Sequence, residues 1–130
     1  MRDNFRSKFE AADDQYIRIK TATIVLNDTR AAGVLLDGLA PIRLEIPSGW
    51  AGTATRVRVR LSQDGTTYRP LYDDAGNEKA IVVAASRAIA LDPSEFCGVT
   101  YLQIRGTQAT GTAAAQLTTA CIVSIIARLV

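Results

Sequence analysis

Histidine is absent from the sequence, and lysine, cysteine and aromatic residues are scarce. Without histidine the chain lacks the commonest general base and the commonest protein ligand of metal ions. The carboxylates of Asp73, Asp74 and Glu78 stand close together, but their order does not match the alternating ligands of a calcium loop. The glycine-containing segments GWAG and GTQATG lack the lysine and the following helix that phosphate-binding loops need. We therefore expect no enzyme, no metal and no cofactor.

Only two cysteines are present, Cys97 and Cys121, and neither has metal-ligand spacing around it. A chain of 130 residues can bury a core without disulfides, so we expect buried free thiols, while a bridge between the two remains the alternative. A secretory signal is also missing from the N-terminus. The longest apolar stretch, residues 117–130, is too short and too interrupted to span a bilayer. We expect a chain that stays in the cytoplasm where it is made and has no membrane partner.

Excess charge of either sign is missing too, because 15 basic and 13 acidic residues leave a net charge of +2. One local cationic feature stands out, since Arg56, Arg58 and Arg60 alternate with apolar residues and would lie about 7 Å apart on one strand face. Such a stripe could follow a phosphate backbone. Cross-strand pairing with Glu45, Glu78 or an aspartate is the favoured alternative, because net charge is low and few aromatic residues accompany the stripe. We expect no nucleic-acid partner.

The chain does have alternating apolar and polar residues, the period of two that half-covered strands require. In residues 16–26 the alternation sets Ile17 and Ile19 against Arg18 and Lys20. The predicted strands cover residues 16–26, 42–46, 55–61, 67–72, 80–85, 87–91, 99–105 and a final segment from about 116. Seven or eight strands with turn residues between them predict an all-β, antiparallel β-sandwich or jelly-roll-like domain over residues 16–130.

Four residues are expected to determine the turns and one end of this domain: Trp50, Asp64, Gly65 and Gly76. Asp64 and Gly65 suit a hairpin turn, because glycine takes positive φ at little steric cost. Residues 106–115 contain only Gly, Thr, Ala and one Gln, so they are expected to form a mobile surface loop outside the core.

The stripe of Arg56, Arg58 and Arg60 is a candidate interface, through arginine pairs between repeated copies, and two further segments are candidate interfaces. Residues 1–15 form a predicted N-terminal arm, in which Phe5 and Phe9 could share one side of a helical turn and dock on a neighbouring subunit; a partly ordered tail is the alternative. The last strand is apolar on both faces, with Ile122 and Ile126 on one of them. Either a central position in the sandwich or a partner subunit could cover that face.

Residues 46–78, IPSGWAGTATRVRVRLSQDGTTYRPLYDDAGNE, and the following segment VVAASRAIALDPSEFCGVTYLQIRG resemble a group of small proteins encoded among phage and prophage structural genes. The shared motifs are the Pro-Ser-Gly-Trp-x-Gly-Thr opening, the Ser-x-Asp-Gly hairpin and the Leu-Tyr-Asp-x-x-Gly turn. The resemblance covers about half of the chain. It implies a virion part: a capsid decoration protein, a head spike or fibre base, or a neck or tail component.

The leading hypothesis is therefore a virion structural protein whose partners are other virion proteins and copies of itself. A second hypothesis is a carbohydrate-binding sandwich that recognises a host surface glycan through Trp50, Tyr68, Tyr72 or Tyr101. For Trp50 the alternative is a plug at the end of the sandwich. A third and weaker hypothesis, an enzyme that uses Asp73 or Asp74, requires a pocket lined by carboxylates.

Overall fold

The structure, a computed structural model, describes residues 17–96, 98–116 and 119–129. These residues form nine β-strands in two antiparallel sheets and one short 3₁₀ helix, η1. One sheet has the strand order β1-β9-β3-β7, and the other has the order β2-β8-β4-β5 with β6 also paired to β4. The elements are β1 (Ile17–Ile24), β2 (Val34–Leu35), β3 (Ala40–Glu45), β4 (Arg56–Ser62), β5 (Arg69–Pro70), β6 (Ala80–Val82), β7 (Ala88–Ala90), η1 (Pro93–Phe96), β8 (Tyr101–Thr107) and β9 (Cys121–Arg128).

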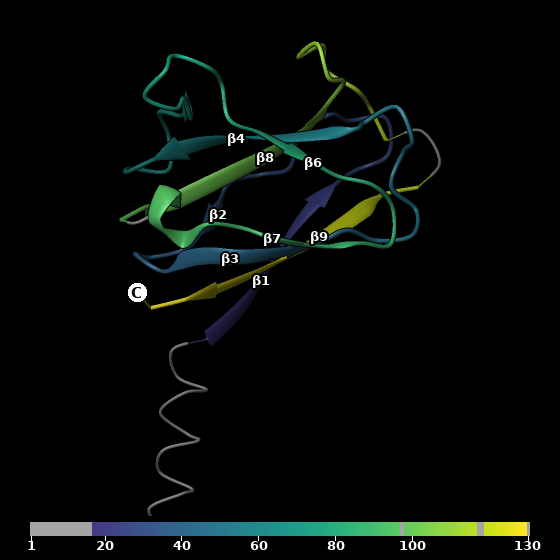
Figure 1. Cartoon of the computed structure of the whole chain (residues 1–130). Helices are drawn as coiled ribbons and strands as arrows, with labels where there is room; N and C mark the ends of the chain where they lie inside the picture. The colour runs from purple at the N-terminus through teal and green to yellow at the C-terminus, as the bar shows by residue number, and fades with distance from the viewer. Residues whose placement is uncertain (1–16, 97, 117–118, 130) are drawn as a thin grey trace, which may run out of the picture.

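The two sheets stack face to face, so the predicted β-sandwich is confirmed (Figure 1). The ninth strand, beyond the predicted seven or eight, is the two-residue β2, which pairs with β8 at Leu102 and Tyr101. β5 and β6 both pair with β4, β5 opposite Arg60 and Leu61 and β6 opposite Arg56 to Arg58. They are two parts of one edge strand, interrupted where residues 71–79 leave the sheet and return. The backbone bond from the Lys79 amide to the Leu71 carbonyl, 2.8 Å long, closes this excursion.

With β5 and β6 counted as one strand, each sheet has four strands and the sandwich has eight. The chain crosses repeatedly between the sheets, and its first and last strands, β1 and β9, lie side by side. Eight strands in two sheets with this order form a jelly roll.

The core lies between the sheets and follows the predicted alternation. Val57 and Val59 of β4 point inward and are fully covered, while the arginines between them are on the outer face. The odd-numbered residues of β9 are buried in the same way: Cys121, Val123, Ile125 and Ala127. In β1 the alternation is confirmed, but the buried side is that of Ala22 and Ile24, and Ile17 and Ile19 are exposed.

Both predicted turns are present. Gly65 has φ +77° and Gly76 has φ +88°, in the left-handed region that glycine occupies without strain. Residues 93–96 form η1, which buries Phe96.

The prediction that residues 106–115 stay outside the core is wrong for part of the segment. Gly106 and Thr107 belong to β8 and are buried, and Ala114 is buried as well. A Cβ atom on Gly106 would lie 3.1 Å from the Ala54 Cβ and 3.5 Å from the Trp50 ring. The small side chains of this segment therefore let it pack under Trp50. No helix of the described residues is long and apolar enough to cross a membrane.

Candidate functional site

The outer face of the β1-β9-β3-β7 sheet is rich in exposed isoleucine. In the register of β1 with β9, Ile19 lies opposite Ile126, and Thr23 lies opposite Ile122. Ile19 is 69% exposed, Ile122 55% and Ile17 43%. β1 contributes no charged residue to this face, because Arg18 and Lys20 project from the other side of the strand. Arg128 of β9 lies opposite Ile17, and Arg43 of β3 lies opposite Ile126, so two arginines border the isoleucines. Ile17, Ile19, Ile122 and Ile126 are called the isoleucine face below.

The predicted interface residues of the last strand differ in how much of their surface is exposed. Ile122 is exposed on the isoleucine face, whereas Ile126 is only 5% exposed, so it offers little surface to another molecule. Phe5 and Phe9 lie outside the described residues. That any of these residues contacts a partner stays a prediction.

Sequence reasoning missed Ile17 and Ile19 as surface residues. Their alternation with Arg18 and Lys20 is typical of a strand that buries its apolar side. The strand is at the edge of its sheet, however, and only Ala22 and Ile24 reach the core. The available signal was the last strand, whose two apolar faces indicate that its sheet carries apolar surface on both sides.

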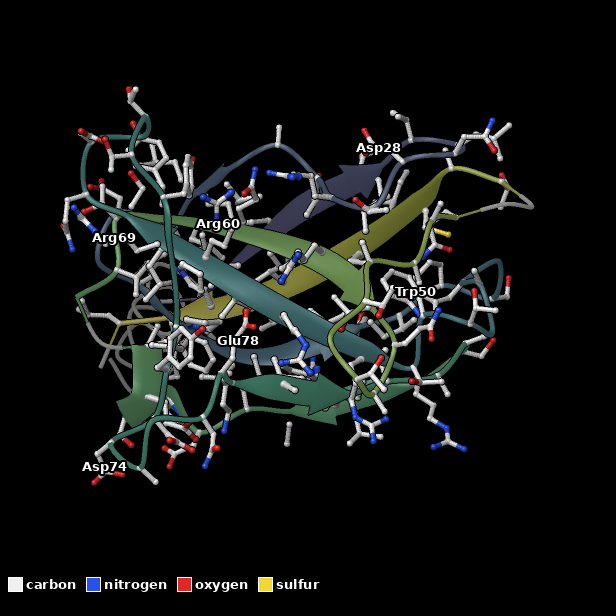
Figure 2. All side chains as sticks on the ribbon, turned by 90° about the horizontal axis from the view of Figure 1, so that it is seen from above. Asp28, Trp50, Arg60, Arg69, Asp74 and Glu78 are labelled. Atoms are coloured by element: carbon white, nitrogen blue, oxygen red, sulfur yellow. The ribbon has the colours of Figure 1, made fainter. Side chains whose placement is uncertain are left out.

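The second sheet has a cationic outer face, seen from above in Figure 2, where Arg60 and Glu78 lie over the sheet. The Arg58 side chain is almost fully buried, and it binds other residues of the same chain. Its Nε donates to the Thr107 Oγ1 (3.0 Å), its Nη2 donates to the Ala109 carbonyl (3.3 Å) and its Nη1 lies 3.5 Å from the Glu78 Oε1. The other Glu78 oxygen lies 3.6 Å from Arg105 Nη2. Glu78 thus bridges two guanidinium groups.

The predicted cross-strand pairing of the arginine stripe is therefore confirmed at Arg58, with Glu78 as the partner. Glu45 instead pairs with Arg43 in the other sheet, at 3.5 Å. Arg60 donates to the Tyr68 carbonyl (3.0 Å) and to the Gln103 Oε1 (3.5 Å), and its guanidinium lies 6.0 Å from the centre of the Tyr68 ring. Arg56 donates to the Thr55 carbonyl at 3.1 Å. All three arginines of the stripe bind groups of their own chain.

Trp50 fills one end of the sandwich, opposite the end that carries Arg69 (Figure 2). The side chain is 5% exposed, and its indole Nε1 donates to the Ala54 carbonyl at 2.7 Å. A ring so covered cannot stack on a sugar, so the plug alternative is confirmed for this residue. Next to this end, the fully buried Gln116 Oε1 accepts bonds from the Ala51 amide (2.7 Å) and the Cys121 thiol (3.3 Å).

Cys121 is a free, buried thiol, as expected, and burial raises its pKa. A raised pKa keeps the thiol protonated and poorly nucleophilic at neutral pH. Cys97 lies outside the described residues.

The exposed aspartates of the turns bind backbone amides. Asp64 Oδ1 accepts from the amides of Thr66 and Thr67, each at 2.8 Å, and from the Ser62 hydroxyl at 3.0 Å. These bonds, the Thr67 amide first, hold the pKa of Asp64 below its ordinary value. Asp73 Oδ1 accepts from the amides of Ala75 (3.0 Å) and Asn77 (2.8 Å). Both aspartates therefore serve as turn residues.

A cleft of about 310 Å³ lies beside the excursion of residues 71–79. Tyr72, 55% exposed, lies on its wall, and an ion pair of 2.7 Å joins Lys79 to Glu95 there. The lining residues are Leu71, Tyr72, Asp73, Asp74, Lys79 and Glu95. Among the residues described here, no group of three or more His, Cys, Asp or Glu side chains is arranged to hold a metal ion. The cleft thus combines an open aromatic ring with carboxylates.

Comparison with known proteins adds no relative: no family model matches the chain, and neither a curated protein nor a solved structure matches it.

Proposed function

We propose that the chain is a structural protein of a phage-type virion, which acts by packing against copies of itself and other particle proteins. The observation that carries the proposal is the isoleucine face, where Ile19 and Ile122 expose more than half of their surface. Exposed apolar surface gathered on one sheet face is typical of a protein interface. The jelly roll supports it by analogy, since viral capsid domains use this architecture, and so does the resemblance of residues 46–78 to phage structural proteins.

In this role the protein is made in the cytoplasm of a bacterial host and becomes part of the particle. It performs no chemistry, and its work is the burial of surface between neighbouring molecules. A capsid decoration protein, a head spike or fibre base, and a neck or tail component would each use the fold in this way.

Mass spectrometry of purified particles tests the proposal. The chain should be found in many copies per particle, and its absence from particles would contradict the proposal. Ile122→Asp should reduce its incorporation, because a charge on the isoleucine face would have to be desolvated in the contact. Val82→Asp is the matched control, since Val82 is 63% exposed on β6 of the other sheet.

The cleft beside residues 71–79 favours a second candidate function, the binding of a host surface glycan. Tyr72 offers an exposed ring, and Asp73, Asp74 and Glu95 offer acceptors for sugar hydroxyls. Glycan-array binding that is lost in Tyr72→Ala but kept in Tyr72→Phe and Val82→Ala would support this function. Lectin domains also use the jelly roll, so the fold does not decide between the two.

A further inference from the structure

The four sheet edges of this sandwich differ sharply in length. Three are blunted in the way that discourages pairing with other chains: β2 has 2 residues, β7 has 3, and the β5–β6 edge is interrupted by the excursion of residues 71–79. The fourth edge, β1, has 8 residues and pairs with β9 in unbroken register from Ile17 to Ile24. It contains no proline or glycine, and no strand of the described residues pairs with its open side.

The side chains of β1 suit a partner on that open side. Ile17, Ile19, Thr21 and Thr23 form its outer row, and all four are β-branched, uncharged and exposed. Such residues are those that favour cross-strand pairing. The row also continues the isoleucine face, since Thr23 lies opposite Ile122 and Ile19 lies opposite Ile126.

We infer that β1 is the contact with a second copy of the chain, formed by antiparallel pairing of the two β1 strands about a twofold axis at Thr21. This register sets Ile19 of each copy opposite Thr23 of the other, and it would join the two four-stranded sheets into one continuous sheet of eight strands. The inference names the contact for the packing role proposed above and rests on that role.

The charges of β1 are compatible with this partner and disfavour the register next to it. On the inner side of β1, pairing about Thr21 sets Lys20 opposite Ala22 and Arg18 opposite Ile24, so no cation faces a cation. A register centred one residue earlier would set Lys20 opposite Lys20, which is unfavourable. Pairing about Thr21 therefore brings no two cations together, whereas pairing about Lys20 does.

The test uses the full chain and its mass in solution at micromolar concentrations, measured by sedimentation equilibrium. The unaltered chain should have twice the monomer mass of 14.0 kDa. Thr21→Lys and Thr21→Glu should each lose the dimer, because the axis places the new charge against its own copy. An equimolar mixture of the two should restore a dimer, since lysine then faces glutamate. Val82→Lys is the matched control and should remain dimeric.

A second pair of variants distinguishes pairing about Thr21 from a nonspecific effect of charge. Thr23→Lys should weaken the dimer at least about tenfold. Mixing it with Thr23→Glu should not restore the dimer, because residue 23 faces residue 19 rather than itself. Far-UV circular dichroism identifies any variant that fails to fold. If one pair of variants does not fold, the result of the other pair decides the test.

A monomeric or trimeric unaltered chain would overturn the inference, and so would an unrestored Thr21 mixture or an equal loss in Val82→Lys. The two proposals also fail separately. A chain present in particles but monomeric in solution keeps the proposed function and overturns β1 pairing. A dimer that is absent from particles keeps β1 pairing and overturns the virion role.

Discussion

Glu78 balances the charges on the outer face of the second sheet. Arg58 and Arg105 lie opposite each other in the register of β4 with β8, and the Glu78 carboxylate lies within 3.6 Å of both. Its side chain is 17% exposed, so water screens these contacts only in part. Glu78→Gln would leave two guanidinium groups facing each other, and should lower the free energy of unfolding by about 1–3 kcal/mol. Urea denaturation measures this loss.

Glu45→Gln is the matched control for that experiment. The Arg43–Glu45 pair has the same separation of 3.5 Å, but both side chains are about half exposed, at 48% and 50%. Exposed pairs contribute little, so the control should change the stability by about 0–1 kcal/mol. Equal losses in the two variants would show that Glu78 has no special role.

Asp64 makes the hairpin turn between β4 and β5 sensitive to acid. The amides of Thr67 and Thr66 and the Ser62 hydroxyl lower its pKa from 3.8. A carboxyl whose pKa is lowered in the folded state stabilises the fold above its ordinary pKa, and this contribution is lost as the pH falls through the folded pKa. Asp64→Asn should therefore lose less stability between neutral and acid pH than the unaltered chain. An NMR titration of the Asp64 carboxyl with a midpoint at or above 3.8 would contradict the assignment.

At the scale of the element, two glycines contrast a position that requires glycine with one that does not. Gly65 has φ +77°, and an added Cβ would lie 3.0 Å from the Tyr101 ring. Gly52 has no positive φ and nothing within 4 Å. Gly65→Ala should cost about 1–3 kcal/mol of unfolding free energy, because strain and crowding add. Gly52→Ala should cost about nothing or stabilise slightly. Thermal unfolding of both variants checks the pair, and similar shifts would contradict the argument.

The elements predicted best from the sequence are those with strong local patterns. The alternation of Val57 and Val59 with arginines gave β4, and the paired apolar faces of residues 121–128 gave β9 and its apolar outer side. The turns at Gly65 and Gly76 were predictable because their residue types meet a specific backbone requirement. In each case a few adjacent residues contain the whole signal.

The rest depends on contacts between residues far apart in the sequence. The buried side of β1 is set by its register with β9, which places Ala22 opposite Val123 and Ile24 opposite Cys121. β5 and β6 form one edge strand only because both reach β4. Glu78, rather than Glu45, pairs with Arg58 because β3 lies in the other sheet. Gly106 and Ala114 are buried because the Trp50 end covers them, which composition alone does not indicate.

At the scale of the whole molecule, the first and last strands of the domain pair along their full length. β9 lies between β1 and β3, and it supplies Cys121, Val123, Ile125 and Ala127 to the core. The first sheet therefore cannot close before the last strand is present. Such non-local pairing predicts slow folding for a chain of this size. The two ends of the domain should also contribute unequally to stability, because the buried core begins only at Ala22.

Two truncations test whether the C-terminal end contributes more to stability than the N-terminal end. Residues 16–130 alone should unfold cooperatively at nearly the same temperature as the full chain, because every buried core residue of the described part lies between Ala22 and Ala127. Residues 1–119 should show no cooperative transition, because loss of β9 removes the strand that joins β1 to β3 and leaves both without their partner. Circular dichroism on heating measures both. A cooperative transition in residues 1–119 would show that the second sheet folds without the first, and a collapse of residues 16–130 would place part of the stability in the N-terminal arm.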